Sequence, residues 1–172
     1  MEKYLIIGLG NPNNSYKYTR HNLGSFLIRL IILNNKIKKT FENKYGKIYI
    51  LNNKYIFLLS KTYMNKIGIS IKYFLKKYKL KIKNLIVISD DIYLNFGIIK
   101  VKQKGGSGGH KGLKNIELIL KSNNYYRIKV GIGHNFKYGE LNKYVLSNMN
   151  KKELSFIKNN LYNQIYNIIL NK

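Results

Sequence analysis

The chain has 172 residues, 45% of them hydrophobic and 13% aromatic, a composition that excludes an intrinsically disordered protein and suits one globular domain over residues 1–172. It contains no cysteine, which excludes disulfides, thiolate metal sites and a cysteine nucleophile. Its 32 basic and 7 acidic residues give a net charge of +25, which favours a polyanionic partner such as nucleic acid. A bias toward AT-rich codons, which encode Lys, Asn, Ile and Tyr, is an alternative source of this charge.

Hydrophobic periodicity predicts strands where apolar residues run on or alternate, and helices where they recur every three or four residues. In chain order, the sequence predicts a buried strand over 4–10, a helix over 22–33, a hairpin over 47–51 and 55–60, a helix over 65–78, strands over 84–91 and 97–103, a helix over 111–121, a strand over 127–133 and a terminal helix over 150–170. This alternation favours an α/β fold, with a mixed twisted β-sheet flanked by helices on both faces.

The sequence also bears on where the protein acts. No apolar run approaches the roughly 20 residues of a membrane span. The amino terminus is a poor secretion signal because it is acidic at its second residue and runs into a glycine-rich turn. We therefore expect a cytoplasmic protein with no membrane partner.

Polar side chains follow two of the predicted strands. Asp90 and Asp91 are the only aspartates and end the strand over 84–91, whereas His21 follows the GLGNP loop after the first strand. Ligands of α/β sheets collect at the carboxyl ends of strands, although two acids there equally suit a turn cap. If the two strands are parallel neighbours, Asp90 can accept a hydrogen bond from one imidazole nitrogen of His21 and leave the other nitrogen as a base.

A glycine-rich stretch, GGSGGHKG (105–112), precedes a predicted helix. It lacks the spacing of a phosphate-binding P-loop, and GLGNPN lacks the third glycine of a dinucleotide-binding fingerprint. The glycines of residues 105–112 allow backbone N–H groups to approach an anionic or ester oxygen at the start of the helix, where His110 and Lys111 lie. A flexible loop without a ligand is the alternative.

Two other kinds of site fit the spacing less well. Ser107 stands in a G-x-S-x-G pattern with Glu117 and His134 following in hydrolase order, but it lies several residues beyond the strand that a nucleophile elbow requires. The three histidines lie in separate segments without close ligand spacing. We therefore expect neither a metal site nor a cofactor.

Taken together, these residues resemble the bacterial-type peptidyl-tRNA hydrolase family. The family's motifs occur in order along most of the chain: GLGNP with Tyr16 and TRHN (8–22), TYMN (62–65), an acid after the central strand (Asp90), GGSGGHKGLKNI (105–116) and RIKVGIG (127–133). The resemblance implies an enzyme of translation that hydrolyses the ester between a peptide and the terminal ribose of tRNA. It also implies tRNA as partner and no metal.

The resemblance assigns four catalytic roles by position. His21 would be the general base that activates water, and Asp90 would orient it. Asn11 would help to select substrates whose amino group is blocked, and Asn65 would hold the peptide backbone and the attacking water. Amide side chains suit these roles because they donate and accept hydrogen bonds, as a peptide backbone does.

The resemblance also implies contacts to the substrate. Tyr16, Tyr63 and Met64 would line the cleft, and Lys102 and Lys129 would hold tRNA phosphate. We expect this enzyme to be a monomer.

Three positions depart from the family's pattern. Lys111 replaces the usual Asn, Tyr93 replaces an acid, and Lys129 replaces an Arg, which loses a bidentate contact to phosphate. Lys111 and the excess of positive charge favour an alternative function, a non-catalytic RNA-binding protein with the same fold. Against this alternative stands the complete set of His21, Asp90 and the two asparagines, which binding alone does not require.

Overall fold

The computed structural model describes residues 2–35, 37 and 39–172, whose seven strands form one sheet. The strands are β1 (Tyr4–Gly8), β2 (Lys39–Glu42), β3 (Gly46–Leu51), β4 (Tyr55–Ser60), β5 (Leu85–Asp91), β6 (Ile99–Lys102) and β7 (Tyr126–Gly131). Their order across the sheet is β2-β3-β4-β1-β5-β7-β6. The four strands β4, β1, β5 and β7 are parallel, and β2, β3 and β6 run antiparallel to their neighbours, so the predicted mixed sheet is confirmed.

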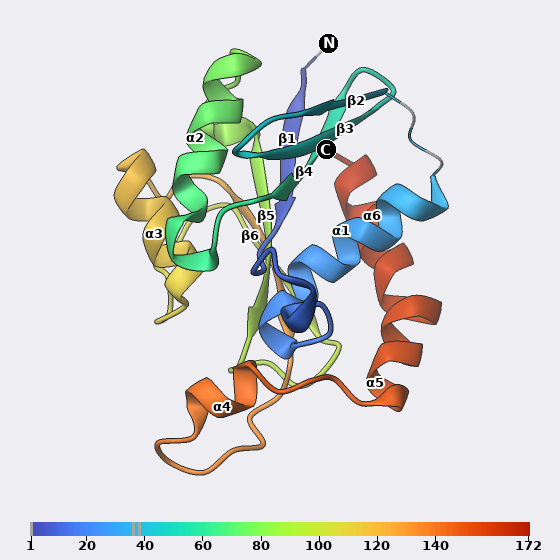
Figure 1. Ribbon diagram of the computed structural model, residues 1–172, viewed down its shortest axis with the longest axis vertical. Coiled ribbons are helices and arrows are strands. Elements are labelled where there is room, and N and C mark those ends of the chain that lie inside the picture. Colours follow the sequence, from blue (N-terminus) through green and yellow to red (C-terminus); the bar gives the residue numbers. More distant parts are fainter. Residues whose placement is uncertain (1, 36, 38) are drawn as a thin grey trace.

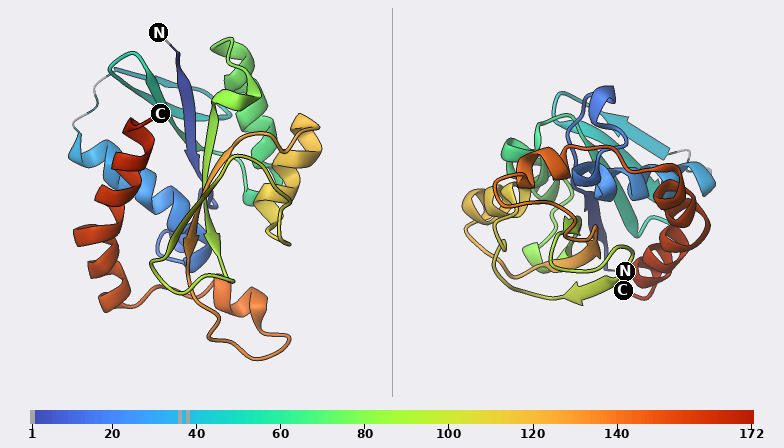
Figure 2. Two further views of the ribbon diagram at one scale, coloured as in Figure 1. Left: turned by 180° about the vertical axis from the view of Figure 1, so that it is seen from behind. Right: turned by 90° about the horizontal axis from the view of Figure 1, so that it is seen from below.

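Two helical layers enclose the sheet. The helices are α1 (Leu23–Asn34), α2 (Ile67–Lys77), α3 (Lys111–Leu120), α4 (Leu141–Val145), α5 (Lys151–Phe156) and α6 (Tyr162–Leu170). Figure 1 shows α2 and α3 on one face and α1, α5 and α6 on the other, as predicted. The short helix α4 lies beyond the carboxyl ends of the parallel strands, at the end of the molecule opposite both termini (Figures 1 and 2).

Strands β1 and β5 are buried along their whole length because helices cover both faces of the sheet. This explains their continuous apolar sequences. Alternate side chains of β1 enter two separate cores. Ile6 packs in the core with Leu27 of α1 and Ile165 of α6. Leu5 belongs to the opposite core, which contains Phe74 of α2.

The structure differs from the predicted elements in four places. β2 and α4 were not predicted, since β2 is exposed throughout and α4 has only 5 residues. β6 is shorter than the predicted strand over 97–103 and three of its four residues are exposed, because it is an edge strand. The terminal helix contains a π-helical turn, Ile157–Leu161, between α5 and α6. No helix in the described ranges has the length and apolarity to cross a bilayer.

Candidate active site

A cleft of about 370 Å³ lies at the carboxyl edge of the parallel strands. The segments that follow β1, β4 and β5 border it, together with the amino end of α3 and the region of α4. The sequence-predicted site residues that line it are Asn11, Tyr16, His21, Tyr63, Met64, Asn65, Asp90, His110, Lys111 and Lys129. Lys102 is outside this lining, on the exposed strand β6.

His21 reaches the cleft because α1 begins directly against β5. A Cβ atom at Gly24 would lie 2.3 Å from the carbonyl oxygen of Ile88, so only glycine permits this approach. β1 and β5 pair in parallel, which brings the loop after β1 to the end of β5. His21 therefore sits in the 3₁₀ turn before α1, buried beside Asp90.

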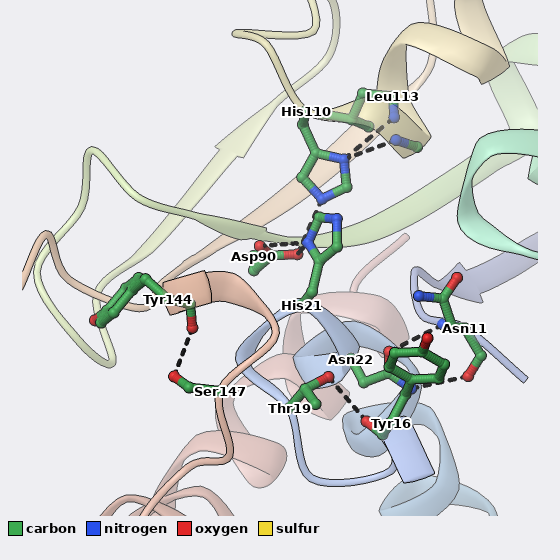
Figure 3. A network of polar contacts seen from close by, with 11 residues as sticks. Asn11, Tyr16, Thr19, His21, Asn22, Asp90, His110, Leu113, Tyr144 and Ser147 are labelled. Atoms are coloured by element: carbon green, nitrogen blue, oxygen red, sulfur yellow. Dashed lines mark hydrogen bonds and ion pairs between the residues drawn. The ribbon is translucent and has the colours of Figure 1, made fainter. Parts of the chain in front are cut away.

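Asp90 accepts hydrogen bonds from two histidines (Figure 3). Nδ1 of His21 lies 2.9 Å from Oδ2 and Nε2 of His110 lies 2.9 Å from Oδ1 of the carboxylate. Because Nδ1 of His21 donates to a carboxylate, its Nε2 retains a lone pair. In the described part of the chain Nε2 has no hydrogen-bond partner, and His21 lines the cleft, so this nitrogen can act on a cleft ligand.

Opposing effects act on the ionisation of Asp90. Burial raises the pKa of the Asp90 carboxyl, but electrostatic attraction to His110 and His21 and the hydrogen bonds from them outweigh burial. The pKa of Asp90 therefore lies well below its usual range, and the group is a carboxylate at neutral pH. An ionised Asp90 fixes the orientation of both imidazole rings.

His21, Asp90 and His110 place one potential metal-ligand atom each within 4.8 Å of one another. Although the histidines lie in separate segments of the sequence, the fold brings His21 and His110 together, whereas His134 lies against Phe136 with ring centroids 4.2 Å apart. Nδ1 of His110 accepts the backbone N–H groups of residues 112 and 113, so its proton is on Nε2, the atom that faces Asp90. A metal at Nε2 would need this proton moved to Nδ1, against two N–H donors. The donor set thus favours a hydrogen-bonded chain over a cation site.

Asn11 presents a donor to the cleft. Its Oδ1 accepts the backbone N–H of Met64 at 2.9 Å, which leaves the NH₂ group of this cleft-lining side chain without a partner in the described residues. The backbone of Asn11 is held by the side chain of Asn22, which accepts from its N–H and donates to its C=O, both at 2.9 Å. Asn65 is exposed in the same cleft, so two amides can face one ligand.

The two lysines of the cleft differ in their surroundings. Lys129 donates to Oδ2 of Asp91 at 2.9 Å, with only 15% of its side chain exposed, so its charge is compensated. Lys111 is exposed at the first position of α3, where the helix dipole disfavours a cation. It forms no ion pair within the described ranges, so an anionic or electron-rich ligand group would relieve this unfavourable placement.

The triad of Ser107, Glu117 and His134 is not assembled. Glu117 lies 3.4 Å from NH2 of the buried Arg127, and His134 packs against Phe136. Although Ser107 lines the cleft, no side-chain hydrogen bond joins it to either partner among the described residues. The structure therefore does not form the triad that the alternative of a serine nucleophile requires.

Two arginines support the site and were not predicted from the sequence. Arg127 is fully buried in β7 and donates to the carbonyl oxygens of Gly105 and Gly106, so it holds the glycine loop that leads to His110. Arg20, next to His21, donates to Ser147 and to Glu153. The sequence offered one indication of their importance, since only three of the 32 basic residues are arginine.

The fold and the cleft define an α/β enzyme with a histidine oriented by a buried carboxylate at the carboxyl edge of a mixed sheet. The chain belongs to the peptidyl-tRNA hydrolase family, whose sequence profile matches residues 5–170, and it is an enzyme of this type. The peptidyl-tRNA hydrolase of Finegoldia magna is 44% identical over 160 residues, which cover 90% of this chain and 83% of that protein.

Other relatives agree in length and in fold. The peptidyl-tRNA hydrolase of Phytoplasma mali is 37% identical over 171 residues, which cover 97% of this chain and 96% of that protein. The crystal structure of peptidyl-tRNA hydrolase from Acinetobacter baumannii is similar with a TM-score of 0.81 and 29% identity, covering 96% of this chain and 83% of that chain.

Proposed function

We propose that this enzyme hydrolyses the ester between a peptide, or an N-blocked amino acid, and the 3′-terminal ribose of tRNA, with His21 as general base. The observation that supports it is the hydrogen bond from Nδ1 of His21 to Asp90, which leaves Nε2 as a proton acceptor in the cleft. The family supplies the substrate class. The net charge of +25 suits a polyanion of this kind.

In the proposed mechanism, Nε2 of His21 takes a proton from water as the water oxygen attacks the ester carbonyl carbon. The same nitrogen then gives the proton to the ribose oxygen as the ester bond breaks, which returns His21 to its starting state. Asp90 stays ionised and stabilises the transient imidazolium. Such base catalysis supplies roughly 10²–10⁴-fold in rate.

Donors around His21 suit the remaining needs of ester hydrolysis. The NH₂ group of Asn11 and the exposed amide of Asn65 face the same cleft and fit a peptide backbone. The ammonium of Lys111 also lines the cleft. Its positive charge can stabilise the negative charge that develops on the ester carbonyl oxygen as water attacks. His110 acts through Asp90 and positions His21.

The test compares N-acetylated aminoacyl-tRNA with free aminoacyl-tRNA as substrates of the wild type, His21→Ala and Ser107→Ala. We expect rapid release from the blocked substrate only, a loss of at least about 10²-fold in His21→Ala, and wild-type turnover in Ser107→Ala. Affinity for deacylated tRNA, measured in parallel, should be retained in His21→Ala. Binding without hydrolysis by the wild type would favour the RNA-binding alternative, and equal losses of turnover and affinity in His21→Ala would indicate a structural histidine.

A further inference from the structure

The cleft has two chemically different halves. The strand order β4-β1-β5-β7 places the loops after β4 and β1 toward one side of the cleft and the ends of β5 and β7 toward the other. The first half contributes the amides of Asn11 and Asn65 and the rings of Tyr16 and Tyr63, but no charged side chain from these two loops apart from His21. The second contributes Asp91, Tyr93 and Lys129, and so contains a carboxylate, an aromatic ring and a cation.

Tyr93 is the most exposed aromatic side chain of the cleft lining, with 73% of its surface accessible. Its backbone is nevertheless held in place. Oδ1 of Asp91 accepts the N–H of Tyr93 at 2.8 Å, and Oδ2 of the same carboxylate accepts from the ammonium of Lys129 at 2.9 Å. The buried carboxylate of Asp91 thus holds both the backbone of Tyr93 and the ammonium of Lys129.

Exposed aromatic rings beside cations are the usual elements of sites for unpaired nucleic acid, in which bases stack on rings and phosphates meet cations. The amide half of the cleft suits a peptide backbone, which both donates and accepts hydrogen bonds. The half with Tyr93 and Lys129 instead suits a nucleotide, whose base is flat and whose phosphate is anionic.

We propose that Tyr93 is a stacking platform for a nucleobase of the unpaired 3′-terminal strand of tRNA. This inference rests on the proposed function, which brings that strand to the cleft. Tyr93 needs only its aromatic face for this role, so its hydroxyl group is dispensable. Lys129 lies on the same anchor as Tyr93, because its ammonium donates to the other oxygen of the Asp91 carboxylate.

A single-tryptophan reporter tests the proposal without ester hydrolysis. The chain has no tryptophan, so Tyr93→Trp introduces one emitter at the platform. Leu33→Trp is the matched control, because Leu33 is also 73% exposed but lies on α1 outside the cleft lining. The probes are the unesterified RNA trinucleotide CCA and an N-acetylated amino acid.

We expect CCA to change the emission of Tyr93→Trp in a saturable manner, with no response in Leu33→Trp and none to the N-acetylated amino acid. A response of Tyr93→Trp to the amino acid instead would assign the ring to the peptide and overturn the proposal. An absence of any response to CCA would overturn it as well. Because no bond is cleaved, either result is independent of whether the enzyme hydrolyses its proposed substrate.

Kinetics provide the second test. Tyr93→Ala should raise KM for N-acetylated aminoacyl-tRNA by about 5- to 150-fold, the range for the loss of one stacked base, and should leave kcat nearly unchanged. Tyr93→Phe keeps the ring and should stay close to the wild type. A wild-type KM in Tyr93→Ala, or an equal loss in both variants, would contradict a stacking role.

Discussion

Asp90 shows at the scale of a single residue how the site combines burial with charge. The carboxylate is buried, yet two imidazole donors keep it ionised. The contact with His21 was predicted from strand ends. The contact with His110 was not, because a run of glycines gives no periodicity from which to infer where the next side chain points. The contacts of Arg20 were not predicted either, because its partners lie more than a hundred residues away in the sequence.

The lowered pKa of Asp90 predicts a pH-dependent contribution to stability. A carboxyl whose pKa is lower in the folded than in the unfolded state stabilises the fold above its unfolded pKa of about 4, and this contribution is lost as pH falls further. The difference in unfolding free energy between the wild type and Asp90→Asn should therefore shrink from about pH 5 to about pH 3. Urea titrations at both pH values measure it, and a constant difference would contradict the lowered pKa.

At the scale of elements, the strongly periodic and long segments were predicted correctly, including β1, β5, α1 and the hairpin of β3 and β4. The sequence does not reveal β2 and α4, because an exposed four-residue strand and a five-residue helix carry too few apolar positions to form a pattern. The π-helical turn in the terminal helix was not predicted either, because its buried residues recur every four residues, a spacing that an α-helix also allows over a short stretch. These elements form because of their contacts with the rest of the fold, which the local sequence pattern does not show.

Arg20 joins three elements around the cleft. Its guanidinium donates to the side chain of Ser147 at 2.8 Å, to the backbone oxygen of Asn148 at 2.7 Å and to both carboxylate oxygens of Glu153 at 3.0 Å. It also lies 4.8 Å from the ring centroid of Tyr144. The segment after α4 and the start of α5 are thereby fixed to the turn that carries His21.

We predict that this clamp contributes measurable coupling energy. Hydrogen bonds to charged groups contribute about 1.5–3 kcal/mol, so Arg20→Met should lower the unfolding free energy by at least that much. A double-mutant cycle of Arg20→Met with Glu153→Gln, followed by denaturant unfolding, should give a coupling above about 0.5 kcal/mol.

The matched control is the exposed pair of Lys61 and Glu42, whose side chains are each 47% accessible and whose atoms lie 2.6 Å apart. The same cycle on this pair should give a coupling of about 0–1 kcal/mol, at the low end, because solvent screens the charges. Equal coupling in the two pairs would mean that the contacts of Arg20 contribute no more than a surface ion pair.

At the scale of the whole molecule, the net charge of +25 does not say which cations are free to bind phosphate. A basic side chain that already pairs with a carboxylate contributes less to such binding than one without a partner. In the register of β6 and β7, Lys102 lies opposite Arg127, an unfavourable pairing of like charges. Arg127 and Lys129 of β7 have carboxylate partners, whereas Lys102 forms no ion pair in the part of the chain that the structure describes. Lysines on an edge strand also oppose edge-to-edge aggregation, which is an alternative reason for Lys102.

The salt dependence of tRNA binding separates these roles. Lys102→Met should reduce the slope of log affinity against log salt by about one unit, because it removes one phosphate contact. Lys129→Met should change the slope less, since Asp91 already compensates its charge.

Lys81→Met is the control for both variants, because Lys81 is exposed at the opposite, amino end of β5. It should leave the slope unchanged. Equal slopes for all three variants would assign the phosphate contacts to other lysines.

The expected monomeric state, cytoplasmic location and absence of a metal remain predictions.

We expect His21 and Asp90 to act as one unit in activating water. The most direct test of this expectation is the single-turnover rate of N-acetylated aminoacyl-tRNA hydrolysis by His21→Ala, Asp90→Asn and the double variant. Because groups that act together are strongly non-additive, the double variant should be no slower than His21→Ala alone. If the two losses instead multiply, Asp90 acts independently of His21, and the hydrogen bond between them is not the basis of catalysis.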